Sequence, residues 1–383
     1  MIKFFLILVL VMTSVMALTR YLLRYCLSGD KLKIWSRRIM LLDIFSVFIM
    51  PLGYGVLKET VFAKYGIILV TIFFMTQISF DILMLFSLAV RNIRRRIINQ
   101  IEEPVDEEKR RLIKNAALIP VISLLTSLYA SFYERCHTVI NKITIHMDNL
   151  PKSFNGFTIA QISDVHLGPY MDLEDLRILL EEAAATKTDM LVITGDLFDN
   201  DPMNFKAINM LNEYTESFPQ GIYYCYGNHE HLRGFAGIEI GLAQTKIHVL
   251  KNTNEYVEIA GEKLYFAGVD YPMDREHFAD MQEIYMDLAV KDIPENSPVI
   301  LLAHHPDFFD SAVKRNVQLT LSGHTHGGQI GIMGVPIVPP VFKYMRGLYQ
   351  QDKNYCYVHV GNGSWFPYRF GCPPEIAVFT LEG

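Results

Sequence analysis

The sequence has few cysteines, and they are not arranged as metal or redox motifs. Five occur in 383 residues, and none belongs to a C-x-x-C pair. This absence argues against zinc ribbons and thioredoxin-like redox sites. Cys225 lies in a run of apolar and aromatic residues, so we expect it to pack as a small apolar side chain. Any metal site must therefore use other ligands.

Basic residues are scarce in the second part of the chain. Of 35 Lys and Arg and 41 Asp and Glu residues, 18 basic and 10 acidic ones lie in Met1–Thr138, and 17 basic and 31 acidic ones follow. Binding to the phosphate backbone of nucleic acids needs clustered Lys and Arg. We therefore expect no nucleic-acid partner. The sequence also has no internal repeat and no low-complexity run.

Apolar residues are abundant, and they are concentrated before about Tyr133. Four apolar segments each approach the ~20 residues that cross a bilayer. They are Phe4–Leu23, Ile39–Leu57, Tyr65–Val90 and Leu112–Phe132. We predict an all-α transmembrane region of about four helices in residues 1–138 and a second domain in residues 139–383. The alternative for the first segment is a signal peptide cleaved after Ala17, but the stronger positive charge follows that segment.

Positive charge predicts the orientation of these helices. Basic residues crowd Arg20–Arg38 and Arg91–Arg111, whereas the intervening loop holds only Lys58 and Lys64 beside Glu59. Positively charged loops stay on the cytoplasmic side. The chain is therefore predicted to be a multi-pass membrane protein whose second domain is extracytoplasmic.

Three polar residues interrupt the apolar segments: Asp43, Gln77 and Asp81. Intramembrane carboxylates are candidates for function. The simpler interpretation, which we favour, is that they lie near an interface or pair within the bundle.

From about Val139 the pattern changes to short strands that alternate with helices. Lys142–Met147 alternates apolar and polar residues, as an edge strand does. Leu173–Thr186 has helical spacing, with Asp172 as its N-cap. The strands fall into two groups, and Ile247–Leu250 opens the second. This order predicts an α/β fold in which two packed sheets with outer helices form a four-layer αββα sandwich.

Five polar clusters each follow a predicted strand. They are Asp164-Val165-His166, Gly195-Asp196, Gly227-Asn228-His229-Glu230, His304 and Gly323-His324-Thr325-His326-Gly327. In layered α/β proteins, sites are built in the loops beyond strand ends. Each cluster alone is common by chance, but five in this arrangement point to one assembled site.

The side chains of these clusters form a ligand set of carboxylate, amide oxygen and imidazole, which suits hard to borderline metal ions. The predicted metal ligands are Asp164, His166, Asp196, Asn228, His304, His324 and His326. Seven ligands exceed one coordination sphere, so we predict two divalent ions that share Asp196. Two ions about 3.5–4 Å apart bind phosphoryl oxygens and lower the pKa of a bridging water that attacks a phosphoester.

His229 follows a predicted ligand and has a different predicted role. It is placed to protonate the leaving oxygen or to stabilise the transition state. His305 is the alternative to His304 as a ligand, and we favour His304. We expect His231 and Asp199 to lie behind the ligands or at the surface.

The ordered motifs SDVHLG, GDLFD, GNHE, AHHPD and GHTHGGQ resemble those of the calcineurin-like metallophosphoesterases. The resemblance covers roughly Ile143–Leu381, and Arg369–Ile376 resembles a bacterial subgroup with membrane-anchored and exported envelope enzymes. It implies manganese, iron or zinc as metals and His229 as the catalytic histidine. It also implies Asp164, His166 and His326 as ligands of one metal, Asn228, His304 and His324 as ligands of the other, and Asp196 as the bridge. Glu230 departs from the Asp that the family often has.

The leading functional prediction is a membrane-anchored dimetal phosphoesterase. Its predicted substrate is a phosphodiester or a lipid-linked or cell-wall-linked phosphoester. One alternative is a cytoplasm-facing pyrophosphohydrolase of a nucleotide-linked acylated sugar, as in some relatives. The other is a non-catalytic sensor, against which the complete ligand set and His229 argue. Gly331–Asp352 is predicted to form a mobile or membrane-facing wall of the site, although its aromatic residues could instead lie in the core.

Overall fold

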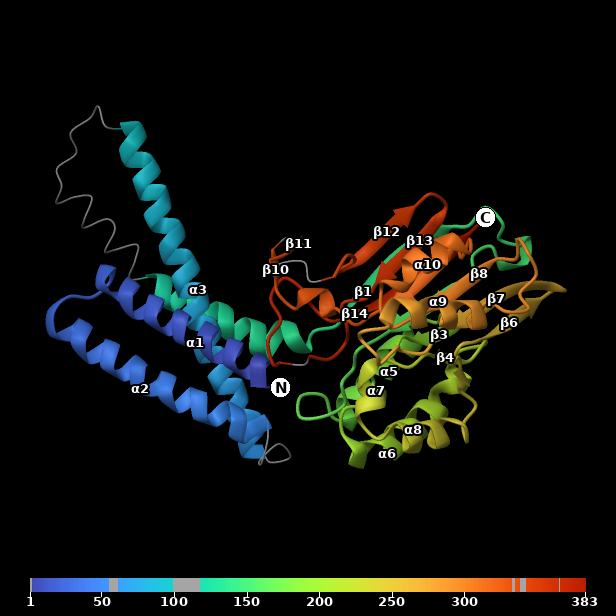
Figure 1. The fold of residues 1–383 in the computed structure, drawn as a ribbon, viewed down its shortest axis with the longest axis horizontal. Helices are drawn as coiled ribbons and strands as arrows, with labels where there is room; N and C mark the ends of the chain where they lie inside the picture. Colours follow the sequence, from blue (N-terminus) through green and yellow to red (C-terminus); the bar gives the residue numbers. More distant parts are fainter. Residues whose placement is uncertain (1, 55–60, 99–117, 333–334, 338–341, 365) are drawn as a thin grey trace. The chain divides into compact units, whose positions relative to one another are not determined.

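The computed structural model describes residues 2–54, 61–98, 118–332, 335–337, 342–364 and 366–383. The chain divides into two compact units (Figure 1). The first comprises Met1–Tyr133 with Phe366–Tyr368, and the second comprises Glu134–Trp365 with Arg369–Gly383. The domain boundary after residue 138 stays a prediction.

The first unit is helical. Its helices are α1 (Ile2–Leu22), α2 (Gly29–Tyr54), α3 (Val61–Ile98) and residues 118–128, which continue into the π-helix η2 (Tyr129–Tyr133). Among the described residues, one helical stretch, Lys64–Arg94 within α3, is long and apolar enough to cross a membrane. The prediction of about four transmembrane helices is therefore not confirmed beyond this candidate span.

Many of the basic residues predicted to lie in loops lie on helices. α2 begins at Gly29, so that Lys31, Lys33 and Arg38 belong to it, and α3 continues to Ile98. Lys and Arg are good helix formers, so positive charge does not mark where these helices end. Residues 55–60 and 99–117, which hold the remainder of the two later loops, lie outside the described residues.

The polar residues of the apolar segments are paired inside the first unit. Gln77 Nε2 donates to Asp43 Oδ1 at 2.8 Å, and Thr19 Oγ1 donates to Asp81 Oδ2 at 3.0 Å. All four side chains are buried. The structure thus places both carboxylates in pairs within the bundle.

The second unit contains two six-stranded sheets. The first has the order β1-β14-β2-β3-β4-β5, and the second has the order β12-β13-β9-β8-β7-β6. The first sheet consists of β1 (Val139–His146), β2 (Thr158–Ile162), β3 (Met190–Ile193), β4 (Ile222–Tyr224), β5 (His248–Val249) and β14 (Glu375–Glu382). The second consists of β6 (Thr253–Ile259), β7 (Glu262–Gly268), β8 (Val299–Leu302), β9 (Leu319–Ser322), β12 (Gly347–Gln351) and β13 (Asn354–Val358).

Strand direction brings the functional loops to common edges. β2, β3 and β4 are parallel neighbours, as are β7, β8 and β9. The last strand, β14, lies between the first two, parallel to β1 and antiparallel to β2. Parallel strands end at the same edge of a sheet, so the loops that follow them meet there.

Three hydrophobic layers hold the second unit together. Between the sheets, residues such as Ile159 and Val192 pack with Phe266 and Ile300. On the outer face of the first sheet lie α5 (Leu173–Ala185), α6 (Asp201–Tyr214) and α8 (Phe235–Leu242), and on that of the second lie α9 (Phe278–Ala289) and α10 (Phe308–Lys314). Strands buried on both faces are apolar along their length, as β3 and β8 are. The arrangement is the predicted α/β fold of packed sheets with outer helices.

One strand was assigned to the wrong sheet. Ile247–Leu250 was expected to open the second group, but β5 pairs with β4 at the end of the first sheet. The choice of sheet depends on which strand edge is free in three dimensions, and the order along the chain does not record it.

A small separate hairpin completes the unit. β10 (Gly331–Ile332) and β11 (Val335–Pro336) pair with each other in an antiparallel sheet of two strands. Of the region Gly331–Asp352, which was predicted to form a wall of the site, residues 333–334 and 338–341 lie outside the described residues.

Candidate metal centre

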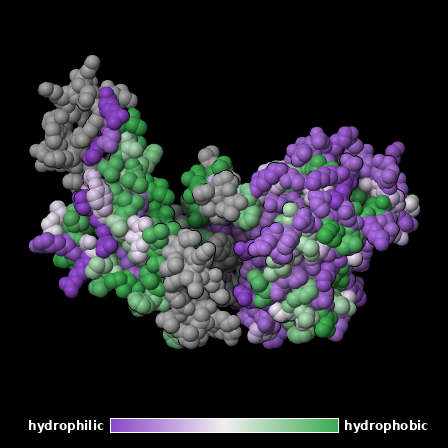
Figure 2. Space-filling view, viewed as in Figure 1, coloured by the Kyte–Doolittle hydropathy of each residue, from purple (hydrophilic) through white to green (hydrophobic). Residues whose placement is uncertain are grey.

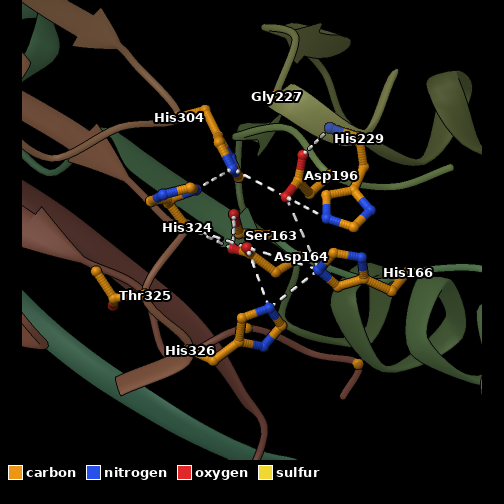
Figure 3. Close-up of polar contacts among 12 residues, drawn as sticks. Ser163, Asp164, His166, Asp196, Gly227, His229, His304, His324, Thr325 and His326 are labelled. Atoms are coloured by element: carbon orange, nitrogen blue, oxygen red, sulfur yellow. Dashed lines mark hydrogen bonds and ion pairs between the residues drawn. The ribbon is translucent and has the colours of Figure 1, made fainter. Parts of the chain in front are cut away.

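The five polar clusters lie beyond the carboxyl ends of five strands. β2, β3 and β4 supply the clusters of Asp164, Asp196 and Asn228, and β8 and β9 supply those of His304 and His324. The labelled carboxylates and imidazoles converge on one region (Figure 3). The centre therefore lies where loops from both sheets meet.

The backbone at these clusters is bent into the left-handed region. The predicted ligands with positive φ are Asp164 (51°), His166 (51°), Asp196 (53°), His324 (71°) and His326 (50°). Left-handed backbone costs a residue with a Cβ about 1–2 kcal/mol. Such strain gathers at functional sites, where the surrounding structure enforces it. The loops are thus shaped to aim side chains inward.

One group of candidate ligands consists of Asp164, His166 and His326, whose ligand atoms lie within 4.8 Å of one another. His166 Nε2 and His326 Nε2 are 3.0 Å apart. Asp164 Oδ1 lies 3.5 Å from His326 Nε2 and 3.9 Å from His166 Nε2. All three side chains are buried.

Hydrogen bonding sets the tautomer of His166. Its Nδ1 lies 3.1 Å from Asp199 Oδ2, and because a carboxylate only accepts, Nδ1 donates. The other ring nitrogen of His166, Nε2, faces His326. Asp199, expected behind the ligands or at the surface, thus orients a candidate ligand.

The second group consists of Asp196, His304 and His324. His304 Nε2 lies 3.0 Å from Asp196 Oδ2 and 3.1 Å from His324 Nδ1. His304 Nδ1 donates to the carbonyl oxygen of Thr194 at 2.7 Å, which turns Nε2 toward the centre. Burial and then neighbouring histidines hold the pKa of His324 and His326 well below the usual value. Both rings are therefore neutral and able to act as ligands.

Asp196 connects the two groups. Its Oδ2, which is 3.0 Å from His304, also lies 3.8 Å from His166 Nε2. Its Oδ1 is held by the backbone N–H of His229 at 2.8 Å. A single carboxylate oxygen therefore faces both sets of imidazoles.

Asn228 presents an unsatisfied oxygen. Its side-chain Oδ1 is buried and has no hydrogen-bond partner among the described residues. Buried polar atoms in native proteins nearly always have partners, so an unsatisfied carbonyl oxygen requires an explanation. A cation supplies one. Two nitrogens on one metal at about 2.0–2.1 Å stand about 3 Å apart, as the paired imidazole nitrogens do here, so these residues fit metal ions.

His229 is partly exposed, and its ring is fixed by Asp199. Its Nδ1 lies 2.7 Å from Asp199 Oδ1, and its Nε2 lies 4.0 Å from Asp196 Oδ2. Burial lowers the pKa of His229, but the hydrogen bond to Asp199 and the charge of Asp196 outweigh burial and raise it to about 8. The ring thus presents Nε2 to the centre as a potential proton donor.

Two motif glycines leave room for the ligands. A Cβ on Gly227 would lie 2.2 Å from Asp196 Oδ1, and a Cβ on Gly323 would lie 2.3 Å from Asp164 Oδ2. Side chains at these positions would displace both carboxylates. The glycines are required for close approach of the backbone.

Glu230 contributes more than its sequence suggested. It is fully buried, and its carboxylate accepts from the backbone N–H groups of Asp196 (3.0 Å), Leu197 (2.7 Å) and Gly227 (2.8 Å). Tyr224 Oη donates to it as well. Glu230 therefore shapes the turn that carries Asp196, although it lies outside the candidate ligand set.

Sequence reasoning named Arg369 without giving it a role. Its guanidinium is fully buried and donates to the carbonyl oxygens of Val360, Gly361 and Cys372 at 2.9–3.1 Å. It also approaches His326 Nδ1 at 3.4 Å. The only sequence signal was its place in the motif that resembles envelope enzymes. Arg369 ties the loop behind His326 together.

His305 and His231, the two other histidines considered in the sequence analysis, lie outside the candidate groups. His305 Nδ1 accepts from the backbone N–H of Asp307 at 3.2 Å, and its ring packs on Phe278. His231 Nε2 pairs with Asp270 at 2.7 Å. In the part of the chain that the structure describes, neither belongs to a group of His, Cys, Asp and Glu that could hold an ion.

Comparisons with known proteins show the family to which the chain belongs. The family model described as calcineurin-like phosphoesterase matches residues 157–328. An uncharacterized metallophosphoesterase of Bacillus subtilis, YkuE, is 34% identical over 66% of this chain and 89% of its own length. One of Aquifex aeolicus is 32% identical over 68% of this chain and 98% of its own. A bovine transmembrane protein with metallophosphoesterase domain is 26% identical over 72% of this chain and 64% of its own. The chain therefore belongs to the calcineurin-like phosphoesterase family and is a metal-dependent phosphohydrolase.

Proposed function

We propose that this chain is a membrane-anchored dimetal phosphoesterase. The observation that carries the proposal is the position of Asp196 Oδ2, between His304 of one group and His166 of the other. Asp164, His166 and His326 would hold one ion, Asn228, His304 and His324 would hold the second, and Asp196 would contact both. Manganese, iron and zinc suit this mixture of imidazole and oxygen ligands.

Two bound divalent ions would neutralise phosphoryl charge and generate a water-derived nucleophile at neutral pH. The chain's own residues supply orientation and proton transfer. Asp199 holds the rings of His166 and His229 by their Nδ1 atoms. His229 Nε2, directed at the centre, can give a proton to the leaving oxygen. This division leaves His229 free of metal binding.

The substrate we propose is a phosphodiester or a lipid-linked or cell-wall-linked phosphoester. The candidate span Lys64–Arg94 supports it, because a tether at the bilayer concentrates the site near such substrates. The similarity to proteins named for a transmembrane part and a metallophosphoesterase domain supports it as well. We further propose a multi-pass anchor with the catalytic unit outside the cytoplasm, because the basic residues cluster at Arg20–Arg38 and Arg91–Arg111.

The test is hydrolysis by the purified full-length chain. The protein, in detergent or nanodiscs, is assayed with manganese, iron or zinc against a soluble monoester, a soluble diester, a pyrophosphate and a lipid phosphoester. We expect metal-dependent release of phosphate or alcohol from the diester or the lipid substrate. Activity on the pyrophosphate alone would favour the nucleotide-sugar alternative, and no hydrolysis of any substrate with any metal would contradict the proposal.

A further inference from the structure

The hairpin β10–β11 exposes an apolar surface on the catalytic unit. Ile332, Val335 and Ile337 are 56%, 66% and 48% exposed. The two strands pair with each other and belong to neither six-stranded sheet. Figure 2 shows hydrophobic surface at this hairpin, in contrast to the mainly hydrophilic surface of the sheets and outer helices of the same unit.

The base of the hairpin is fixed to the catalytic unit. Gly331 N donates to Phe370 O at 2.7 Å, and Ile337 N donates to Ile330 O at 3.1 Å. The backbones of Gly331 and Gly371 are so close that a Cβ on Gly371 would lie 2.2 Å from Gly331 O. The exposed aliphatic side chains are therefore held outward by a built support.

Residues that precede and follow the hairpin in the sequence lie at the metal centre. The sequence has no charged residue between His326 and Lys343. His326 at one end is a candidate ligand, and Phe342 at the other has its ring 5.1 Å from that of His324 and 5.4 Å from that of His305. The described residues on either side of this uncharged stretch of sequence thus lie at the metal centre.

We propose that this hairpin inserts its aliphatic side chains into the interface of the bilayer that anchors the chain, and so presents the metal centre to phosphoesters at the level of the lipid headgroups. The inference rests on the proposed function, because it takes Lys64–Arg94 as a membrane anchor. It assigns the substrate class as a phosphoester borne by a membrane lipid.

The described part of the apolar surface suits a bilayer better than a protein partner. A stable protein interface buries about 800 Å² on each partner, which the three exposed aliphatic side chains among the described residues of the hairpin do not provide by themselves. A tethered domain needs less buried apolar area to bind a membrane, because the tether already confines it near the bilayer and raises its effective concentration there. Aliphatic side chains in a stretch of sequence without charged residues suit the boundary between headgroups and acyl chains.

The experiment measures lipid contact in the full-length chain in nanodiscs. In a Cys26→Ser, Cys136→Ser background, Val335→Cys carries an environment-sensitive fluorophore, and nitroxide groups on the acyl chains serve as quenchers. The matched control is Ile284→Cys on α9, where the native side chain is 50% exposed. We expect a blue-shifted emission at position 335 and quenching several-fold stronger than at position 284.

Equal quenching at the two positions would overturn the proposal. So would a blue shift at position 335 that grows with protein concentration and ignores the lipid quencher, since that result indicates contact between copies of the chain. This readout needs no catalysis, so it distinguishes failure of the hairpin proposal from failure of the proposed function.

A kinetic experiment tests the consequence for substrate. We expect Val335→Asp to lower hydrolysis of a vesicle-embedded phosphoester at least several-fold and to leave hydrolysis of a soluble diester unchanged. Ile284→Asp should change neither rate. Equal loss on both substrates in Val335→Asp would show that the hairpin only supports the structure of the site, and would overturn the proposal.

Discussion

Among the single side chains of the centre, Asp196 has the most connected position. Its Oδ2 faces both groups of imidazoles, and its Oδ1 is held by the His229 backbone. We expect Asp196→Asn to reduce the content of both metals, because the amide loses the negative charge that both ions would share. Elemental analysis of the purified variant measures this. Loss of one ion with full retention of the other would contradict a bridging role.

The prediction for His229 is different, because its ring faces the centre but His229 is not one of the predicted metal ligands. We expect His229→Ala to retain both metals and to lower turnover by roughly 10²–10⁴-fold, the usual contribution of general acid–base catalysis. The measurement is kcat together with metal content. A variant that hydrolyses substrate at the normal rate would remove His229 from the mechanism.

At the scale of elements, the turn after β3 depends on Glu230. Four backbone N–H groups and one hydroxyl point at its carboxylate. We expect Glu230→Gln to lower the free energy of unfolding by about 1–3 kcal/mol, because the amide N–H₂ faces donors and leaves buried groups unpaired. Metal affinity should fall with it, since the turn carries Asp196.

Chemical denaturation measures this change, and Glu258→Gln on the exposed part of β6 is the matched control. Glu258 is half-exposed and makes only a long ion pair with Lys263 at 4.0 Å. If the two variants unfold at the same denaturant concentration, Glu230 does not support the turn.

The elements themselves show which features a sequence records. Buried strands such as Met190–Ile193 were predictable because every residue in them is apolar. The helix after Asp172 was predictable from its N-cap and from the helical spacing of its apolar residues. The five-residue helix α7 and the two-residue strands β10 and β11 are too short for any periodicity. Such elements are determined by the contacts around them.

The same distinction holds for the site. The candidate ligands were named from residue type and position after strands, because carboxylate and imidazole chemistry is local to the residue. The sequence did not predict that Asp199 orients His166 and His229. Only the folded chain brings its carboxylate to these two rings. The left-handed backbone conformation of Asp164 and His324 could not be predicted either, because neither residue is a glycine.

At the scale of the whole molecule, metal binding should stabilise one unit selectively. The candidate ligands all lie in the second unit, and ions that bind only the folded state add about 2.7 kcal/mol per site at 100 times Kd. We expect a chelator to lower the unfolding temperature of the second unit and to leave that of the first unchanged. Calorimetry with and without chelator tests this, and an unchanged thermogram would contradict it.

Orientation is the other property of the whole chain that can be tested directly. Basic residues at Arg20–Arg38 and Arg91–Arg111 should keep those regions in the cytoplasm. A topology reporter fused after Gly383 is therefore expected to show that this position lies outside the cytoplasm. One inserted after Ser28 is expected to show a cytoplasmic position. Cytoplasmic activity of the first fusion would overturn the orientation and favour the nucleotide-sugar alternative.

The position of β14 has a consequence for biosynthesis. The strand β14 (Glu375–Glu382) pairs with both β1 and β2. The edges of these two early strands that β14 covers therefore stay unpaired until the ribosome has synthesised β14. Every candidate ligand is synthesised before that moment, yet Asp164 and His166 follow β2, whose sheet is still incomplete. Metal loading of the finished centre is thus expected to be post-translational, and a nascent chain stalled before residue 375 should expose strand edges that attract chaperones.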